Sequence, residues 1–237
     1  MIRDYVCVDL ETTGVNVKWN KILEIGAVKV RDGQVVDEFS MLVNPGEAIS
    51  PFIVNLTGIT DEMVKDAEHI ETVLPKFLEF AGDDVLLGHN LIFDFSFLKQ
   101  NAINLNHEFE KSGVDTLRIS RKLLSDLESR KLDYLCEYFG IEDNNHHRAL
   151  NDAKVTVALY EILFEKYSED NPELFQERNL QYKVKKMVPI TDKQKKYLLA
   201  LIEYHKLEID YNIDDLTKNE ASRKIDKILA SKGRILY

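Results

Sequence analysis

The stretch Tyr5-Val-Cys-Val-Asp-Leu-Glu-Thr-Thr-Gly14 decides the fold of this chain. Its opening residues are aromatic, β-branched or apolar and predict a β-strand. Alternate side chains of a strand point to the same face, so Asp9 and Glu11 lie side by side. The opposite face carries Val6, Val8 and Leu10. Two acids on an apolar strand repel each other and resist burial, and a divalent cation between them relieves that repulsion. Taken alone, the pair also fits a strand end exposed to solvent.

The segments around this strand indicate an α/β fold. Two further strands are predicted at 22–30 and 34–43, joined by the turn signal Arg31-Asp32-Gly33. The short apolar run at 85–88 suits a buried strand. Helical spacing of apolar residues predicts helices at 72–80, 93–101, 132–139 and 149–164. Helices interleaved with strands after an opening hairpin favour a mixed sheet flanked by helices.

Two more segments carry acids at the start of predicted helices. His89-Asn-Leu-Ile-Phe-Asp94 follows the buried strand at 85–88, and His147-Arg-Ala-Leu-Asn-Asp152 opens the helix at 149–164. Together with Asp9-Leu-Glu-Thr-Thr-Gly14, and in this order, they resemble the DEDDh exonuclease family, which includes ribonuclease T and the proofreading subunit of bacterial replicative DNA polymerase. Any one motif is weak, whereas three in order are specific. The resemblance covers roughly residues 1–167.

The resemblance implies an RNase H-like fold and a two-metal mechanism of phosphodiester hydrolysis. It assigns Asp9, Glu11, Asp94 and Asp152 as metal carboxylates and His147 as the general base. The expected cofactors are two Mg²⁺ or Mn²⁺ ions, which can activate a water and stabilise the leaving oxygen together. Four carboxylates would offset the charge of two such ions.

The spacing of His147 and Asp152 sets a condition on the local structure. In a continuous helix, residues i and i+5 lie roughly 140° apart, so the two side chains converge only if His147 precedes the helix. Asp143-Asn144-Asn145 favours a loop there. A histidine suits a general base because its ordinary pKa lies near neutral pH. His146 is a rival by proximity, and the family spacing selects His147.

Four further residues are candidate contacts for the terminal nucleotide: Thr12, Thr13, Val15 and Asn90. In the resembling family, backbone groups after the first acid pair hold the 3′-terminal sugar, and an apolar wedge stands four positions beyond the glutamate. Val15 occupies that position, and simple packing is its alternative role. Arg148 is either a phosphate contact or a solvated side chain. We assign His89 a structural role.

Composition and charge fit a globular protein with a polyanionic partner. The chain has 237 residues, 44% of them hydrophobic, and a net charge of −10. Residues 183–237 hold 13 Lys and Arg against 8 Asp and Glu, whereas residues 1–182 have a balance of −15. An acidic body with a basic tail is a hint of a polyanionic partner, and a simply solvated lysine-rich face is the alternative. No signal peptide or membrane span is expected, and two distant cysteines indicate no disulfide framework, so we expect a cytoplasmic location.

The chain is expected to divide into three parts. Residues 1–167 form the exonuclease domain, 168–190 a linker or terminal helix, and 191–237 a small basic helical module. Thr191 with Gln194, and Thr217 with Glu220, fit the capping-box pattern and predict one helix each. The module is expected to bind nucleic acid, or a polymerase or another protein; a solvated helical hairpin that packs on the main domain is the further alternative.

We therefore expect a 3′→5′ exonuclease that releases nucleoside 5′-monophosphates from single-stranded or frayed DNA. An exoribonuclease that trims RNA 3′ ends is the first alternative, because nothing in the motifs separates ribose from deoxyribose. An inactive nucleic-acid-binding or polymerase-associated module is the second. The presence of all five expected catalytic residues argues against it.

Overall fold

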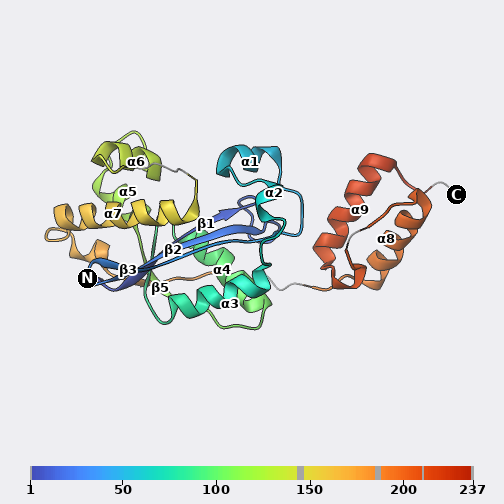
Figure 1. Ribbon diagram of the computed structural model, residues 1–237, viewed down its shortest axis with the longest axis horizontal. Coiled ribbons are helices and arrows are strands. Elements are labelled where there is room, and N and C mark those ends of the chain that lie inside the picture. Colours follow the sequence, from blue (N-terminus) through green and yellow to red (C-terminus); the bar gives the residue numbers. More distant parts are fainter. Residues whose placement is uncertain (1, 143–146, 185–187, 210, 236–237) are drawn as a thin grey trace. The chain divides into compact units, whose positions relative to one another are not determined.

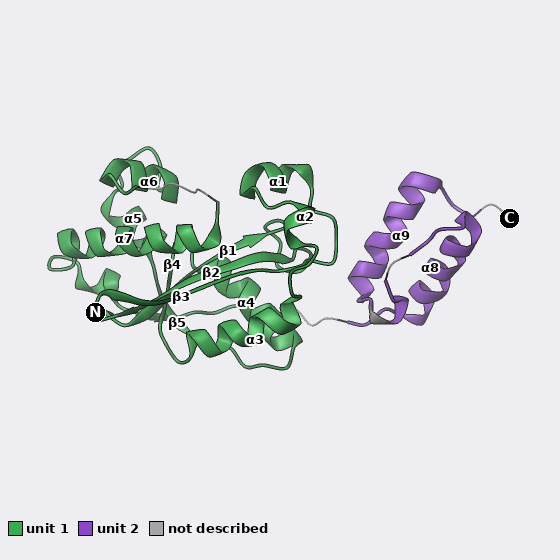
Figure 2. Ribbon diagram, in the orientation of Figure 1, with its two compact units in different colours: residues 1–184 green, residues 185–237 purple. Residues whose placement is uncertain are grey.

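A computed structural model describes residues 2–142, 147–184, 188–209 and 211–235. The chain divides into two compact units, residues 1–184 and 185–237 (Figure 2). Residues 143–146, which include His146 and the loop expected at Asp143-Asn144-Asn145, lie outside the described residues, as do Lys185 and Lys186.

The first unit opens with three antiparallel strands, β1 (Tyr5–Thr12), β2 (Ile22–Arg31) and β3 (Gln34–Leu42). The turn between β2 and β3 has two central residues, Asp32 and Gly33, with φ of 47° and 75°. Positive φ at both positions suits a tight hairpin, for which Asp-Gly is a favoured pair. The predicted hairpin is therefore confirmed.

The six-stranded sheet has the order β3-β2-β1-β4-β5-β6. β4 (Leu86–Gly88) runs parallel to β1, β5 (Ser112–Asp115) runs parallel to β4, and β6 (Arg178–Asn179) pairs antiparallel with β5. This mixed sheet confirms the expected α/β class. Strands β5 and β6 are too short for a period-2 pattern, and the sequence did not predict them.

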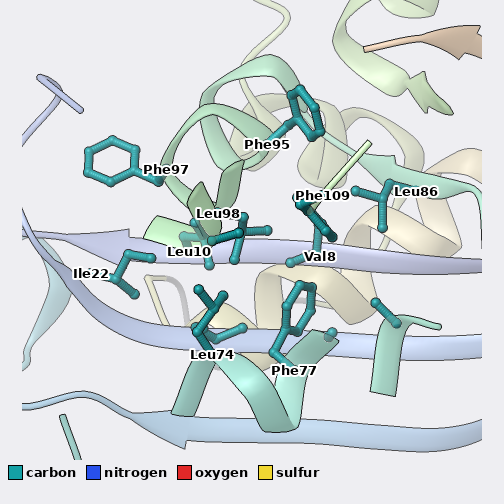
Figure 3. Packing of buried hydrophobic residues seen from close by; sticks show 14 of the residues in the cluster. Val8, Leu10, Ile22, Leu74, Phe77, Leu86, Phe95, Phe97, Leu98 and Phe109 are labelled. Atoms are coloured by element: carbon teal, nitrogen blue, oxygen red, sulfur yellow. The ribbon is translucent and has the colours of Figure 1, made fainter. Parts of the chain in front are cut away.

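Helices cover both faces of this sheet (Figure 1). One face carries α3 (Ile70–Ala81) and α4 (Ile92–Asn104), and the other carries α5 (Thr116–Leu123), α6 (Leu132–Phe139) and α7 (Ala149–Tyr167). Val8 and Leu10 of β1 pack against Phe77 of α3 and Leu98 of α4 in the first layer (Figure 3). Because both faces are buried, β1 is apolar on both sides until it reaches its acids.

Two short helices, α1 (Pro51–Thr57) and α2 (Asp61–Val64), follow β3. Ser50 and Thr60 cap them by accepting hydrogen bonds from backbone N–H groups in the first turn. A small apolar cluster lies beneath them, built from Leu23, Ile49, Ile53, Ile59 and Val64.

The segment 168–190, expected as a linker or terminal helix, contains ordered parts of the first unit. A 3₁₀ turn, η1 (Pro172–Phe175), buries Phe175 against α7, and β6 extends the sheet. The backbone N–H of Leu180 donates to the carbonyl of Lys111, and Tyr182 packs in the core layer of α4. The sheet therefore includes residues well beyond the end of α7.

The second unit is a pair of helices, α8 (Asp192–His205) and α9 (Lys218–Lys232), linked through the 3₁₀ turn η2 (Ile213–Asp215). Both predicted capping boxes form: the hydroxyls of Thr191 and Thr217 accept from the N–H groups of Gln194 and Glu220. A separate apolar core joins the helices, including Leu198, Leu201, Ala221, Ile225 and Ile228. Within the described residues, no helix is long and apolar enough to cross a membrane.

Gly26 of β2 lets the start of α7 lie directly on the sheet. A Cβ atom at this position would lie 2.0 Å from the backbone nitrogen of Leu150 and 2.1 Å from the carbonyl carbon of Ala149. Both atoms belong to the first turn of α7, which also holds Asp152. Since backbone cannot move aside as a flexible side chain can, only glycine fits.

We predict that Gly26→Ala lowers the free energy of unfolding by about 3 kcal/mol, the upper end of overpacking costs, because α7 must shift. The measurement is urea unfolding. Gly46→Ala is the matched control: its φ of 66° is also strained for alanine, but nothing lies within 4 Å of the added atom. It should cost only about 1 kcal/mol. Equal losses in the two variants would contradict close packing at Gly26.

Candidate active site

Four acids from three elements meet at one end of the sheet. Asp9 and Glu11 stand on β1, Asp94 in the first turn of α4, and Asp152 in the first turn of α7. The chain enters α4 immediately after β4, the parallel neighbour of β1, and α7 begins over β2 on its other side. The topology thus brings together acids that are up to 143 positions apart in the sequence.

Asp94 is fixed by the backbone of β1. Its side chain is 2% exposed, and Oδ1 accepts a hydrogen bond of 3.1 Å from the N–H of Leu10. That bond favours the charged carboxylate, but burial outweighs it and raises the pKa of Asp94 well above its ordinary range. The Asp94 carboxylate is therefore aimed at the strand that carries the other acid pair.

Burial and neighbouring acids raise the pKa values of the two acids of β1. Burial, Asp94 and Asp152 raise the pKa of Asp9 well above its ordinary value. For Glu11, which is 8% exposed, burial, Asp152 and Glu24 raise the pKa from 4.5 to about 8. Such mutual shifts arise when carboxylates share a site and cannot all be charged at once.

Three of the predicted residues are close enough to bind one ion. One ligand atom from each of Glu11, His147 and Asp152 lies within 4.8 Å of the others. His147 has φ of 62° and precedes α7, which begins at Ala149. The expectation that it stands on a turn before the helix is confirmed. Buried carboxylate oxygens that repel one another, with an imidazole beside them, are a donor set suited to a divalent cation.

An arginine clamp fixes the start of α7. Arg148 binds Glu24 of β2 through two hydrogen bonds, Nε to Oε2 at 3.0 Å and Nη2 to Oε1 at 2.7 Å. The N–H of Ala149 also donates to Glu24 at 3.1 Å. Glu24 is 1% exposed and stands opposite Glu11 in the strand pairing. Arg148 is therefore paired with Glu24, although 39% of its side chain is exposed, and it positions the turn between His147 and Asp152.

Glu24 was missed in the sequence. Its signal is an acid inside the apolar run Ile22-Leu-Glu-Ile25, the same anomaly that singled out Asp9. A buried charge must be paired, so the anomaly predicts a cationic partner even though it does not identify which one.

The hydroxyls of Thr12 and Thr13 are engaged within the loop after β1. Thr12 Oγ1 donates to the carbonyl of Gly14 at 2.8 Å, and Thr13 Oγ1 accepts from the N–H of Lys21 at 2.9 Å. These bonds shape the loop that carries Val15. The side chain of Val15 is 84% exposed, which excludes the packing role left open for it.

Asn90 and His89 occupy the bend between β4 and α4. Asn90 is exposed, has φ of 67°, and its N–H donates to Asp115 Oδ1 at 2.9 Å. His89 Nε2 lies 2.8 Å from the carbonyl oxygen of Arg130, which can only accept, so Nε2 carries the proton. Burial lowers the pKa of His89 and keeps it neutral. Its contacts fit the structural role assigned to it.

Comparison with known sequences identifies the family. The RNase T family, described as exonuclease, matches residues 6–160. The polymerase "DNA polymerase III PolC-type" of Caldanaerobacter subterraneus subsp. tengcongensis is 48% identical over 166 residues, and that of Clostridium perfringens is 43% identical over 167. Each match covers 70% of this chain but 12% of the polymerase. The chain thus spans a small part of these relatives' length.

Solved structures share the fold. Exonuclease X, in complex with 5′ overhanging duplex DNA, is 28% identical with a TM-score of 0.56, covering 69% of this chain and 93% of its own. The nuclease domain of 3′hExo, a DEDDh family member bound to rAMP, has a TM-score of 0.63 at 20% identity, covering 76% of this chain and 98% of its own. The motifs, the sheet and the family match agree. The chain belongs to the RNase T family, in the DEDDh group of 3′–5′ exonucleases.

Proposed function

We propose that this chain hydrolyses single-stranded or frayed DNA from the 3′ end with two divalent ions, and releases nucleoside 5′-monophosphates. The observation that carries the proposal is the convergence of Glu11, His147 and Asp152 beside Asp9 and Asp94 at one end of the sheet. DNA is favoured because relatives at 43–48% identity are DNA polymerases, and because Exonuclease X was solved with DNA.

The donor set supports Mg²⁺ or Mn²⁺ as the cofactor. Enzymes of this family are typically metal-dependent. Asp9, Glu11, Asp94 and Asp152 would hold the ions, and hard cations prefer such oxygen ligands. Bound there, the ions would supply an activated water and charge stabilisation for the leaving oxygen. Because burial raises the pKa of Glu11 to about 8, metal binding would displace a proton from this acid at neutral pH.

The side chains of this chain would then divide the remaining tasks. His147 stands within reach of the ligand atoms of Glu11 and Asp152, so its imidazole can accept the proton of the attacking water. The Arg148–Glu24 clamp holds that histidine's turn in place. Val15, which is exposed beyond the acid pair, would contact the terminal base. Backbone groups near Thr12 and Thr13, together with Asn90, would position the last sugar and its phosphate.

We also propose that residues 191–237 form an auxiliary module that grips nucleic acid. Lys193 and Lys196 of α8 and Lys227 of α9 are exposed, while Lys195 is paired with Asp214. Phosphate contacts from such lysines add affinity without sequence preference. A docking surface for a polymerase or another protein is the alternative role for this module.

The central test is cleavage of matched DNA and RNA oligonucleotides labelled at the 5′ end. We expect a descending ladder, faster on DNA, that stops in EDTA and returns with Mg²⁺ or Mn²⁺. Asp152→Ala should lose several orders of magnitude in rate while remaining folded. Immediate release of the labelled 5′ nucleotide would refute the 3′→5′ polarity. Full activity in EDTA would refute the metal mechanism. Faster cleavage of RNA than of DNA would make RNA the substrate.

The acid cluster should make the metal-free protein less stable as pH rises. Folded Glu11 keeps its proton up to about pH 8, whereas the unfolded chain releases it near 4.5. Between these values the folded state binds more protons, so stability falls with rising pH by up to about 1.4 kcal/mol per unit for one proton. Thermal unfolding in EDTA from pH 5 to 8 measures the slope.

Glu11→Gln, which stays neutral, should flatten that slope and raise the melting temperature at pH 8. The exposed Glu165→Gln on α7 is the matched control and should leave both unchanged. A slope in the opposite direction, or one that Glu11→Gln leaves intact, would contradict the burial of charge at Glu11.

His147→Ala should reduce the rate about 10²–10⁴-fold, the usual share of general base catalysis. Metal binding should survive because the four carboxylates remain, and calorimetric titration with Mn²⁺ measures it. The exposed His107→Ala is the control for loss of a histidine. Near-normal activity of His147→Ala, combined with a crippled His146→Ala, would transfer the role to His146.

A chain ending at Val184 should keep its turnover at saturating DNA, because the whole sheet lies before that residue. Its affinity for single-stranded DNA should fall. The slope of log affinity against log salt concentration (the salt slope) should flatten by roughly 2–3.5 if three to five phosphate contacts are lost. Lys193→Gln with Lys196→Gln in the full chain should give part of that change. Unchanged affinity and slope would leave protein docking as the module's role.

A further inference from the structure

A basic pocket of about 550 Å³ lies at the bend between β4 and α4. Its walls come from the bend after β4, the last turn of α5, and the loop that leads into α6. The charged side chains in it are Arg121, Arg130, Lys131 and Glu128. The pocket thus has three cationic side chains and one acid, although residues 1–182 as a whole carry a net charge of −15. The pocket is therefore a local site for an anion.

The bend after β4 joins this pocket to the proposed metal site. Cys7 of β1 pairs with Leu87 of the parallel strand β4, and His89 and Asn90, two walls of the pocket, form the bend that follows β4. That bend leads into α4, whose first turn carries Asp94. The pocket therefore lies at the end of β4 that leads to the acids.

The pocket is held in shape by interactions that leave its cations available. His89 donates to the carbonyl of Arg130 and ties the loop to the end of β4. The side chain of Arg130 donates through Nη2 to the carbonyl of Ser125, while its buried Nε has no partner among the described residues. A buried guanidinium N–H without an acceptor is costly, and a phosphate oxygen is its natural partner.

Two further features favour a phosphate over a carboxylate or a neutral ligand. Within the described ranges, neither Arg121 nor Lys131 forms an ion pair. Helix α6 starts at the pocket, since its N-cap Lys131 and its first residue Leu132 both line it, and Lys131 provides no side-chain cap. The Tyr134 N–H is bonded to Asp133 Oδ1, so the positive end of the helix dipole is what the start of α6 contributes. Arginine forks and a helix start together match the oxygens of a phosphate.

We propose that this pocket binds a backbone phosphate of the strand whose 3′ end is being cleaved, upstream of the scissile bond. The proposal rests on the proposed function and adds the site that holds the strand after its terminal nucleotide enters. Because the bend after β4 connects the pocket to the first turn of α4, one DNA strand would extend from the acids to the pocket. Gripping an upstream phosphate would make binding depend on substrate length, and it would act on every sequence equally.

The test uses Arg121→Gln with Lys131→Gln in the full chain. Arg130 stays because its backbone and Nη2 support the loop. The matched control, Lys122→Gln with Lys166→Gln, removes two exposed charges from α5 and α7 that do not line the pocket. KM and kcat are measured on DNA oligonucleotides of two to ten nucleotides. The p-nitrophenyl ester of thymidine 5′-monophosphate, which has no upstream phosphate, serves as the minimal substrate.

The pocket variant should raise KM on the longer oligonucleotides by about tenfold per lost cation, the size of a charge-assisted hydrogen bond. Its salt slope should fall by roughly 0.7 for one lost phosphate contact. Hydrolysis of the ester and kcat should not change, and the control variant should behave as the wild type. Equal KM values for the pocket variant and the wild type at every length would overturn the proposal.

Two other outcomes are informative. One distinguishes a phosphate of the substrate strand from the phosphate of the released product, and the other distinguishes failure of the pocket proposal from failure of the proposed exonuclease function. If the pocket variant only weakens inhibition by thymidine 5′-monophosphate and leaves oligonucleotide KM unchanged, the pocket holds the released product and the upstream grip is wrong. If the wild type releases no mononucleotides from any oligonucleotide with metal present, the proposed function fails, whatever the pocket variant does.

Discussion

Mutual repulsion among buried carboxylates is the constraint on which this structure depends. Asp9, Glu11 and Asp94 all have pKa values raised first by burial and then by neighbouring carboxylates, so the folded chain holds them together at a cost. Apolar layers on both faces of the sheet offset that cost and keep the acids from separating. The Arg148–Glu24 pair neutralises one further acid directly beneath the site and leaves the others for a cation.

The parts predicted from the sequence share a strong local signal. The β2–β3 hairpin follows from Asp32-Gly33, the helices of the second unit from their capping boxes, and the strand β1 from its apolar alternation. The site followed from order and spacing of three motifs, which the family match supports. Even the turn at His147 could be deduced, because a helix would have separated it from Asp152.

What the sequence did not reveal depends on contacts between distant residues. Strand β6 has two residues and exists only because β5 pairs with it. Arg148 and its partner Glu24 are 124 positions apart in the sequence, so no local pattern predicts whether Arg148 binds that acid or points into solvent. Gly26 looks like any glycine in a strand until α7 lies on it. The basic pocket likewise combines a helix end, a loop and a bend that only the fold brings together.

The outer strand β3 has a consequence for how the protein behaves at high concentration. It ends the sheet with a nine-residue edge, and exposed Val35 and Val36 could invite pairing with a second copy. Asp37 and Glu38 follow directly, and two such edges aligned antiparallel about this acidic step would bring like charges face to face. The charges of these two acids therefore oppose aggregation through pairing of β3 edges, and neutral substitutions at both positions would remove that protection.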